Sequence, residues 1–266
     1  MNSAVTTSPS RVLLTVNGGI ASIVLNGAHN GNAIDVNLAR DLKDALHRCE
    51  KDKTIRVILL TGGGRIFCAG GDLAAIYQRG DKGPDYVSEI LSHLHEAILT
   101  IARVPVPVVA GVHGAAAGAG LALACSCDLA IAAASARFIL AYGRVGLTPD
   151  GSSSWFLPQL IGVRRSLELA LLGRELSARD ALDWGLVNEV VADTDLATRL
   201  GEIGKALSIG AVAAFGQAKR LLRNSSERDL ETQMKDELET LRGALRGTEA
   251  AIGMEAFLQK RPAKFV

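Results

Sequence analysis

The chain has 266 residues, of which 48% are hydrophobic, enough for one large globular domain or one domain with an appendage. Its 29 basic and 28 acidic residues leave a formal net charge of +1, which excludes a global field that would gather nucleic acid or anionic lipid. Small molecules or other proteins are therefore the expected partners, with no nucleic acid and no membrane.

The first predicted element is a β-hairpin, because the apolar runs VLLTV (12–16) and IASIVLN (20–26) flank an Asn-Gly-Gly turn. A short N-terminal tail enters it, without the apolar core and cleavage site of a signal peptide. Helical spacing begins at Ile34. The predicted inner face comprises Ile34, Leu38, Leu42, Leu46 and Cys49. The residues predicted to turn away from it are Arg40, Lys43, Asp44 and His47.

Strand, glycine-rich loop and helix then alternate twice, which predicts an α/β layered fold with largely buried strands. The first unit comprises RVILLTG (56–62), the loop GGGRIFCAGGDL (62–73) and a helix. A second helix is expected at about 86–102. The second unit comprises PVVAGV (107–112), HGAAAGAG (113–120) and LALAC (121–125), and further strands are expected at DLAIAA (128–133) and ARFIL (136–140).

Residues 104–127 imitate a membrane span, because they contain no Lys, Arg, Asp or Glu. Two prolines and four glycines interrupt this stretch, and its VVAGV run is typical of a buried strand, so a span is not expected. Beyond residue 192 the chain reads as amphipathic helix. We predict a core domain at 1–192 and a helical region at 193–266, which lies on the core or on a neighbouring subunit.

Cysteines and histidines receive structural interpretations. The cysteines, which form neither a CxxC pair nor a secreted framework, are Cys49, Cys68, Cys125 and Cys127. We expect them to be reduced, in a cytoplasmic protein. No metal site is expected, because His93 and His95 stand two apart on a helix and cannot share a metal on one face. His113 is expected to be a hydrogen-bonded residue at a strand end.

Both glycine-rich loops lead from a strand into a helix, so each presents backbone N–H groups that favour negative charge. A phosphate loop is not supported, because Asp72 follows Gly70-Gly71 where a lysine is required. The second loop lacks the third glycine of a dinucleotide fingerprint, and Trp155 replaces the last glycine of a nucleophile elbow. Two interpretations remain: an oxyanion hole with one N–H from each loop, or close packing of helices on strands.

Asp150 lies between Pro149 and Gly151 in the stretch VGLTPDGSSSW (145–155). Locally this sequence favours a type I or II turn, or a helix N-cap at Asp150. The alternative is an acid/base in an apolar interior, since the only charged residues between Val104 and Ile161 are Asp128, Arg137, Arg144 and Asp150. Asp128, at the start of a predicted strand, is expected to be structural.

Five stretches form a pattern in order along the chain: LNGAHNGNAI, VILLTGGGRIFCAGGDL, PVVAGVHGAAAGAGLALACSCDLAIAA, FILAYGRVGLTPDGSSSWFLPQLIG and ELSARDALDWGLVNEVV. In combination they resemble the crotonase, or enoyl-CoA hydratase/isomerase, superfamily. The resemblance covers nearly the whole chain and implies a spiral of ββα units, a helical C-terminal trimerisation region and a homotrimer or dimer of trimers. It also implies an acyl-CoA thioester substrate, with no cofactor apart from the coenzyme A of that substrate.

The resemblance places the two oxyanion N–H donors on Gly71 and Ala119. The two glutamates of family hydratases align with Ala122 and Tyr142, neither of which is a carboxylate, whereas Asp150 aligns with the acid of several family isomerases and of a dehalogenase. The pattern is most similar to the isomerases of phenylacetate catabolism, and fatty acid metabolism is the other implied setting. Residues assigned to substrate binding by resemblance are Ala33, Ala69, Asp72, Leu73, Tyr142 and Trp155.

The expected activity is therefore a double-bond shift in an enoyl-CoA through an enolate, with Asp150 as acid/base. Burial beside Leu147, Trp155 and Phe156 is expected to raise the pKa of Asp150. Alternatives are an enoyl-CoA hydratase, an acyl-CoA hydrolase or dehalogenase that uses Asp150 as nucleophile, and a non-catalytic acyl-CoA- or RNA-binding protein. Lys260 and Arg261 are candidate contacts for the coenzyme A phosphates.

Overall fold

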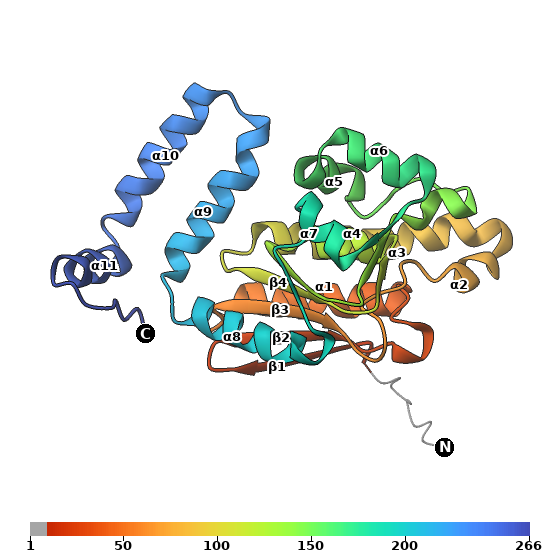
Figure 1. Cartoon of the computed structure of the whole chain (residues 1–266), viewed down its shortest axis with the longest axis horizontal. Coiled ribbons are helices and arrows are strands. Elements are labelled where there is room, and N and C mark those ends of the chain that lie inside the picture. Colours follow the sequence, from red (N-terminus) through yellow and green to blue (C-terminus); the bar gives the residue numbers. More distant parts are fainter. Residues whose placement is uncertain (1–9) are drawn as a thin grey trace, which may run out of the picture.

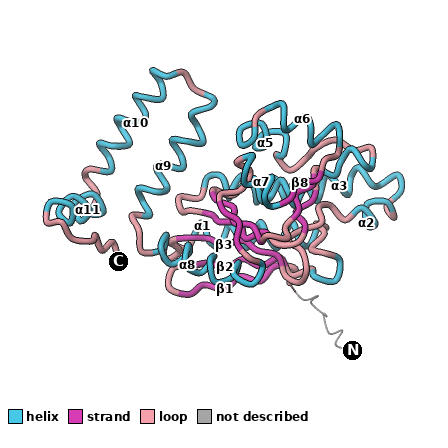
Figure 2. Tube along the Cα trace, in the orientation of Figure 1, coloured by secondary structure: helices cyan, strands magenta, loops and turns pink. Residues whose placement is uncertain are grey.

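A computed structural model of the protein describes residues 10–266, and the predicted N-terminal tail lies almost wholly outside them. The fold is mixed α/β, with helices packed around two sheets (Figures 1 and 2). The larger sheet has the strand order β1 (Val12–Asn17), β2 (Ile20–Leu25), β3 (Val57–Gly62), β4 (Val108–Val112), β6 (Leu129–Ala133) and β9 (Glu189–Val191). The smaller sheet has the order β5 (Ala115–Ala117), β7 (Arg137–Ile139) and β8 (Glu175–Ser177).

The layered arrangement predicted from the sequence is confirmed. β1 and β2 form the antiparallel hairpin, and every later neighbour in the larger sheet is parallel. All five residues of β4 are buried, as expected of a parallel strand covered on both faces. The predicted loop 113–120 is partly wrong, because Ala115–Ala117 form β5 between Gly114 and Gly118, which both have positive φ.

Eleven helices are found among the described residues. They are α1 (Val36–Lys51), α2 (Leu73–Tyr77), α3 (Gly83–Arg103), α4 (Ala119–Ser126), α5 (Ser153–Ile161), α6 (Val163–Leu172), α7 (Ala178–Trp184), α8 (Leu196–Ser208), α9 (Val212–Asn224), α10 (Leu230–Ala244) and α11 (Thr248–Leu258). The predicted start of α1 at Ile34 is wrong. Asp35 caps the helix by accepting from the Leu38 N–H (2.7 Å), and Ile34 instead bridges to Gly71.

The segment that imitates a membrane span is divided among β4, β5 and the eight-residue α4. None of the helices within residues 10–266 combines the length and the apolar character needed to cross a bilayer.

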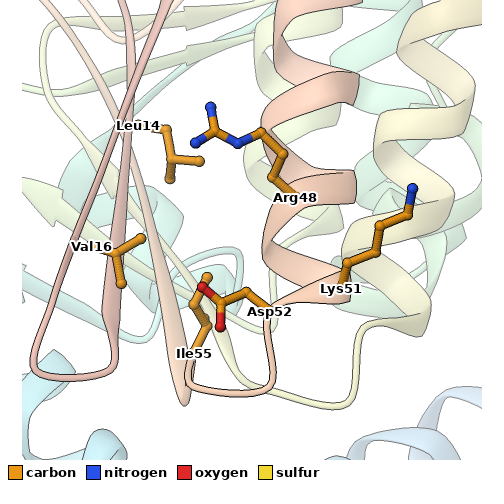
Figure 3. Close-up of a pocket in the computed structure, with 6 residues that line it drawn as sticks. All are labelled: Leu14, Val16, Arg48, Lys51, Asp52 and Ile55. Atoms are coloured by element: carbon orange, nitrogen blue, oxygen red, sulfur yellow. The ribbon is translucent and has the colours of Figure 1, made fainter.

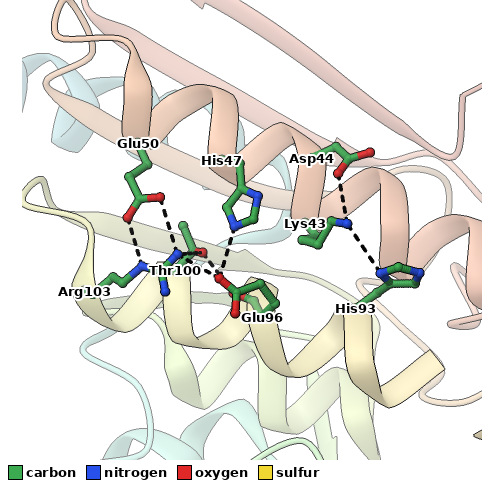
Figure 4. A network of polar contacts seen from close by, with 8 residues as sticks. All are labelled: Lys43, Asp44, His47, Glu50, His93, Glu96, Thr100 and Arg103. Carbon is green, nitrogen blue, oxygen red and sulfur yellow. Dashed lines mark hydrogen bonds and ion pairs between the residues drawn. The ribbon is translucent and has the colours of Figure 1, made fainter. Parts of the chain in front are cut away.

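The polar face of α1 packs beside α3 through a network of charged and hydrogen-bonded side chains (Figure 4). Arg103 contacts both Glu50 (2.9 Å) and Glu96 (2.8 Å), and His47 contacts Glu96 (3.2 Å). Lys43 reaches His93 on α3 at 3.4 Å. Lys43 and His47, which the sequence predicted only to turn away from the core, thus connect α1 to α3.

The C-terminal helices join the core through Asp128, whose predicted structural role is confirmed. Its carboxylate accepts from the Val108 N–H (2.8 Å), from Lys219 (2.8 Å) and from Arg223 (2.7 Å). Lys219, only 8% exposed, also donates to the Ile101 carbonyl at 2.6 Å. One carboxylate therefore ties α9 to the start of β4 and β6.

Replacing Asp128 with Ala should lower the free energy of unfolding by about 3 kcal/mol, because two mostly buried cations lose their counter-charge. Urea denaturation followed by circular dichroism measures the change. Asp183→Ala is the control, because Asp183 forms an exposed pair with Arg179, and it should change stability little. Equal stability of both variants would show that the ion pairs do not anchor α9.

The predicted division of the chain at residue 192 stays a prediction. On its C-terminal side, α8 adds Leu196 and Leu200 to a second apolar core against β3, β4 and β6. The helices that stand away from the sheets in Figure 1 are α9, α10 and α11.

Candidate active site

The first glycine-rich loop is held against the segment before α1. The Ile34 N–H donates to the Gly70 carbonyl (2.7 Å), and the Asp72 N–H donates to the Ile34 carbonyl (3.0 Å). Gly70 has a φ of +94°, which a residue with a side chain rarely adopts. The Gly70 carbonyl and the Asp72 N–H are thus both hydrogen-bonded to Ile34. The Gly71 N–H, which lies between them in the chain, has no hydrogen-bond partner among residues 10–266.

The second loop meets the first directly. Ala119 is the first residue of α4, so its N–H has no partner within the helix. A Cβ built on Gly70 would lie 2.7 Å from the Ala117 carbonyl oxygen and 3.4 Å from the Ala119 nitrogen. Only glycine permits this approach, which brings the backbone of Gly70, the neighbour of Gly71, close to the Ala119 nitrogen.

Asp150 occupies a turn, but its carboxylate is not used there. The Ser153 N–H donates to the Asp150 carbonyl (3.1 Å), and the intervening Gly151 and Ser152 both have positive φ, as in a type I′ turn. A turn is thus confirmed for the backbone, but the predicted type I or II is wrong, because both central residues have positive φ. The N-cap alternative is wrong, since α5 begins at Ser153 with Ser152 in the cap position.

The Asp150 carboxylate instead accepts a short hydrogen bond from the Tyr142 hydroxyl. Tyr142 lies in a 3-10 helix, Ala141–Val145, and is only 8% exposed. A Cβ built on Gly118 would lie 3.8 Å from Cζ of Tyr142. One side chain therefore contacts both the candidate base and the loop that carries the Ala119 N–H.

Burial raises the pKa of Asp150 above its ordinary value, while the Tyr142 hydrogen bond and the charge of protonated His95 hold it down. The expected environment is partly wrong, because Leu147 and Trp155 are 51% and 47% exposed. The apolar contacts of this turn come from elsewhere: a Cβ on Gly151 would touch Ala122, Leu94 and Ile98, which belong to α4 and α3.

The same arrangement affects Tyr142. Burial and the adjacent Asp150 carboxylate both raise the pKa of its hydroxyl, which therefore stays protonated and can donate. A protonated hydroxyl beside an ionised carboxylate forms a strong, charge-assisted hydrogen bond.

The residues assigned to substrate binding by resemblance lie around this site with different exposures. Ala33 is buried, Ala69 and Leu73 are exposed beside Gly71, and Trp155 faces outward on α5. Asp72 caps α2 by accepting from the Ala75 N–H (3.0 Å), and its other oxygen accepts from Asn30 (3.3 Å). Both carboxylate oxygens of Asp72 are thus used within the fold.

Sequence reasoning missed Asn32, which organises the first loop. Its buried amide donates to the carbonyls of Gly63 (2.9 Å), Ile66 (2.9 Å) and Phe67 (3.0 Å), and its oxygen accepts from the Gly27 N–H (2.8 Å). Its φ of +56° is unusual outside glycine. The Asn-Gly-Asn sequence at 30–32 carries a weak signal, because asparagine tolerates this conformation better than other residues.

We expect Asn32→Ala to lower the free energy of unfolding by about 3 kcal/mol, because it leaves buried backbone groups unpaired in a strained conformation. Asn37→Ala removes an exposed asparagine from α1 and should change the free energy of unfolding little. Chemical denaturation of the two variants tests the difference, and comparable losses would show that Asn32 has no special structural weight.

The remaining sequence predictions can be placed on the structure. His113 follows β4 and contacts the Gly64 carbonyl (3.1 Å), as expected. The four cysteines are free and buried, and burial raises the pKa of Cys68, Cys125 and Cys127 to about 12. Within residues 10–266, no three His, Cys, Asp or Glu side chains gather as metal ligands.

Lys260 and Arg261, the candidate contacts for the coenzyme A phosphates, follow α11, and α9 separates that helix from the sheets (Figure 1).

A separate hollow of about 350 Å³ lies between β1 and the C-terminal end of α1 (Figure 3). Its lining residues are Leu14, Val16, Arg48, Lys51, Asp52 and Ile55. None of them is a predicted site residue, so this hollow is distinct from the candidate site around Asp150 and Tyr142.

Comparison with known proteins identifies the class of this fold and site. The family model described as enoyl-CoA hydratase/isomerase matches residues 15–266. A 1,2-epoxyphenylacetyl-CoA isomerase of Escherichia coli is 36% identical over 256 residues, covering 96% of this chain and 97% of that protein. A 4-chlorobenzoyl coenzyme A dehalogenase of an Arthrobacter species is 34% identical over 230 residues, with coverages of 84% and 81%.

A solved structure, an enoyl-CoA hydratase from a Polaromonas species, superimposes with a TM-score of 0.91 at 32% identity, covering 95% of this chain and 98% of that one. The chain belongs to the enoyl-CoA hydratase/isomerase family and has the crotonase fold. The resemblance noted in the sequence is thereby confirmed at the level of family and fold.

Proposed function

We propose that this protein shifts a double bond in an enoyl-CoA thioester, with Asp150 as the acid/base. One observation carries the proposal: the Tyr142 side chain contacts the Asp150 carboxylate and also lies beside Gly118, the residue before the Ala119 N–H. The side chain of Tyr142 therefore links the proposed base, Asp150, with the residue next to the proposed oxyanion donor, the Ala119 N–H.

In the proposed reaction, the thioester oxygen accepts hydrogen bonds from the Gly71 and Ala119 N–H groups. Asp150 removes a proton from the acyl chain, and the negative charge that moves onto the oxygen is stabilised by the two amides. The same carboxylate then returns the proton to another carbon. No bond to water forms, and no electrons leave the substrate.

The residues at the two hydratase glutamate positions support isomerisation over hydration. Ala122 and Tyr142 stand at the positions that resemblance assigns to the two glutamates of hydratases. Adding water requires a group that activates the water as well as one that handles the substrate proton, whereas a double-bond shift can use a single base.

A panel of thioesters tests this proposal. The protein is incubated with 2-enoyl-, 3-enoyl- and aryl-acetyl-CoA compounds, and chromatography separates isomers, hydrates and free acids. Interconversion of 2-enoyl and 3-enoyl isomers is the expected result. Accumulation of 3-hydroxyacyl-CoA alone would replace the isomerase proposal with the hydratase alternative.

A second candidate is nucleophilic attack by Asp150, as in a hydrolase or dehalogenase, and it is favoured by the 34% identity to the Arthrobacter dehalogenase. In a dehalogenase this route displaces halide and forms an aryl ester on the carboxylate, and in a hydrolase it displaces the coenzyme A thiolate and forms a mixed acyl anhydride; water then cleaves either intermediate. A single turnover in ¹⁸O-water followed by mass spectrometry of the Asp150 peptide distinguishes it, because only ester hydrolysis at the carboxyl carbon labels the side chain.

We also propose that no cofactor is needed beyond the coenzyme A of the substrate, and that the chain acts in the cytoplasm as a homotrimer or a dimer of trimers. The assembly is supported by an apolar stripe on α10, in which each residue is at least 53% exposed. The stripe comprises Leu230, Met234, Leu238, Leu241 and Leu245. Sedimentation equilibrium measures the assembly directly.

A further inference from the structure

Tyr142 reaches Asp150 from a segment that is tied to its surroundings by hydrogen bonds. Its carbonyl accepts from the Leu147 N–H (3.1 Å), and Arg144, in the same 3-10 helix, donates to the Gly173 carbonyl (2.8 Å). Its ring lies beside Gly118, where a Cβ would be in ordinary van der Waals contact with Cζ (3.8 Å) and Cε2 (4.0 Å). These contacts place the hydroxyl beside the Asp150 carboxylate.

The hydroxyl contacts only one oxygen of the Asp150 carboxylate, Oδ1. Ser153 does not compete for the carboxylate, because its hydroxyl donates to the Asp150 carbonyl instead (2.8 Å). The second oxygen, Oδ2, has no hydrogen bond from any residue in 10–266 and is the oxygen left for a substrate.

We propose that Tyr142 is a positioning residue, which fixes the Asp150 carboxylate relative to the Ala119 N–H and leaves Oδ2 to exchange the proton with the substrate. The inference rests on the proposed function, since it assigns a role within the same site. It differs from the role assigned by resemblance, in which Tyr142 contacts the substrate itself.

The surroundings of Asp150 explain why such a residue is needed. The helices packed against this turn present apolar groups, namely Ala122 from α4 and Leu94 and Ile98 from α3. The titratable groups that act on Asp150 are Tyr142 and, from α3, the exposed His95. Burial raises the pKa of Asp150 and so disfavours its ionised form, the form that serves as a base, whereas the Tyr142 hydrogen bond favours that form.

The test is Tyr142→Phe, which removes the hydroxyl and keeps the ring beside Gly118. Without this hydrogen bond the pKa of Asp150 should rise, so the acidic limb of the kcat/KM profile should move to higher pH by about one unit. At neutral pH kcat should fall about tenfold, with KM changed less than about twofold. Steady-state rates of enoyl-CoA isomerisation measured across the pH range provide both values.

Tyr86→Phe is the matched control, because it removes a phenolic hydroxyl on α3 whose ring stacks with Arg79 (4.5 Å). Its profile should match that of the wild type. Thermal unfolding of both variants checks that the folds are intact. A Tyr142→Phe protein with an unchanged acidic limb and unchanged kcat would overturn the positioning role.

A readout that does not need turnover separates this inference from the proposed function. The carboxyl stretch of ¹³C-aspartate, assigned to Asp150 by its loss in Asp150→Asn, is titrated by infrared spectroscopy in wild type and Tyr142→Phe. A higher pKa in the variant supports the inference, and an equal pKa rejects it, whatever reaction the enzyme catalyses. Full activity of Asp150→Asn would instead reject Asp150 as the base.

Discussion

Asp150→Asn should lower the rate of double-bond shift by about 10³-fold, because the amide has the shape of the carboxylate but cannot accept a proton from carbon. Its oxygen can still accept from Tyr142, so the local geometry should persist. KM should change little, because the variant removes an interaction with the reacting proton and not with the bound thioester. Isomerisation rates on the best thioester of the panel measure the effect.

The stability of the same variant gives a second test. A carboxyl whose pKa is higher in the folded than in the unfolded protein lowers stability at every pH above the unfolded pKa, and the loss disappears as pH falls below it. Burial raises the pKa of Asp150 in this way. Asp150→Asn should therefore be as stable as the wild type at pH 7, or more stable.

Asp183→Asn serves as the control, since Asp183 is an exposed carboxylate on α7. It should retain the rate and the stability of the wild type. If Asp150→Asn loses both stability and activity, Asp150 is mainly a structural residue. If it keeps its activity, another group removes the proton.

Periodicity predicted the elements of the fold better than their connections. Alternating and helical apolar spacing places the hairpin, β3, β4 and α1 correctly, since these elements bury one face or both. The boundary at Ile34 and the strand β5 depend on contacts with distant residues, Gly71 and β7, which no local pattern contains. Tertiary pairing decides such short segments.

The candidate site divides in the same way. Gly71, Ala119 and Asp150 could be selected as residue types in suggestive loops and by resemblance. The contact of Tyr142 with both Gly118 and Asp150 could not, because it depends on how a 3-10 helix and a turn fold back onto α4. Asn32 is a polar residue in a loop, where no apolar period marks burial.

The second large effect is expected for Ala119→Pro, which deletes the proposed oxyanion donor of α4. Proline is tolerated at the first position of a helix, and Gly118 has no Cβ to clash with its ring. The variant should fold, but kcat should fall by at least about 10²-fold, because one of two hydrogen bonds to the developing negative charge is lost. Rapid-quench measurement of the chemical step gives the value.

Val163→Pro makes the same substitution at the first position of α6, at a residue that is 63% exposed. Because this N–H also lies at a helix start, the control carries the same backbone restriction without touching the site, and its rate should equal that of the wild type. Equal rates for both proline variants would mean that the Ala119 N–H does not stabilise the transition state. A loss confined to Ala119→Pro, with Asp150 still ionised in the infrared titration, would separate stabilisation of the oxyanion from removal of the proton.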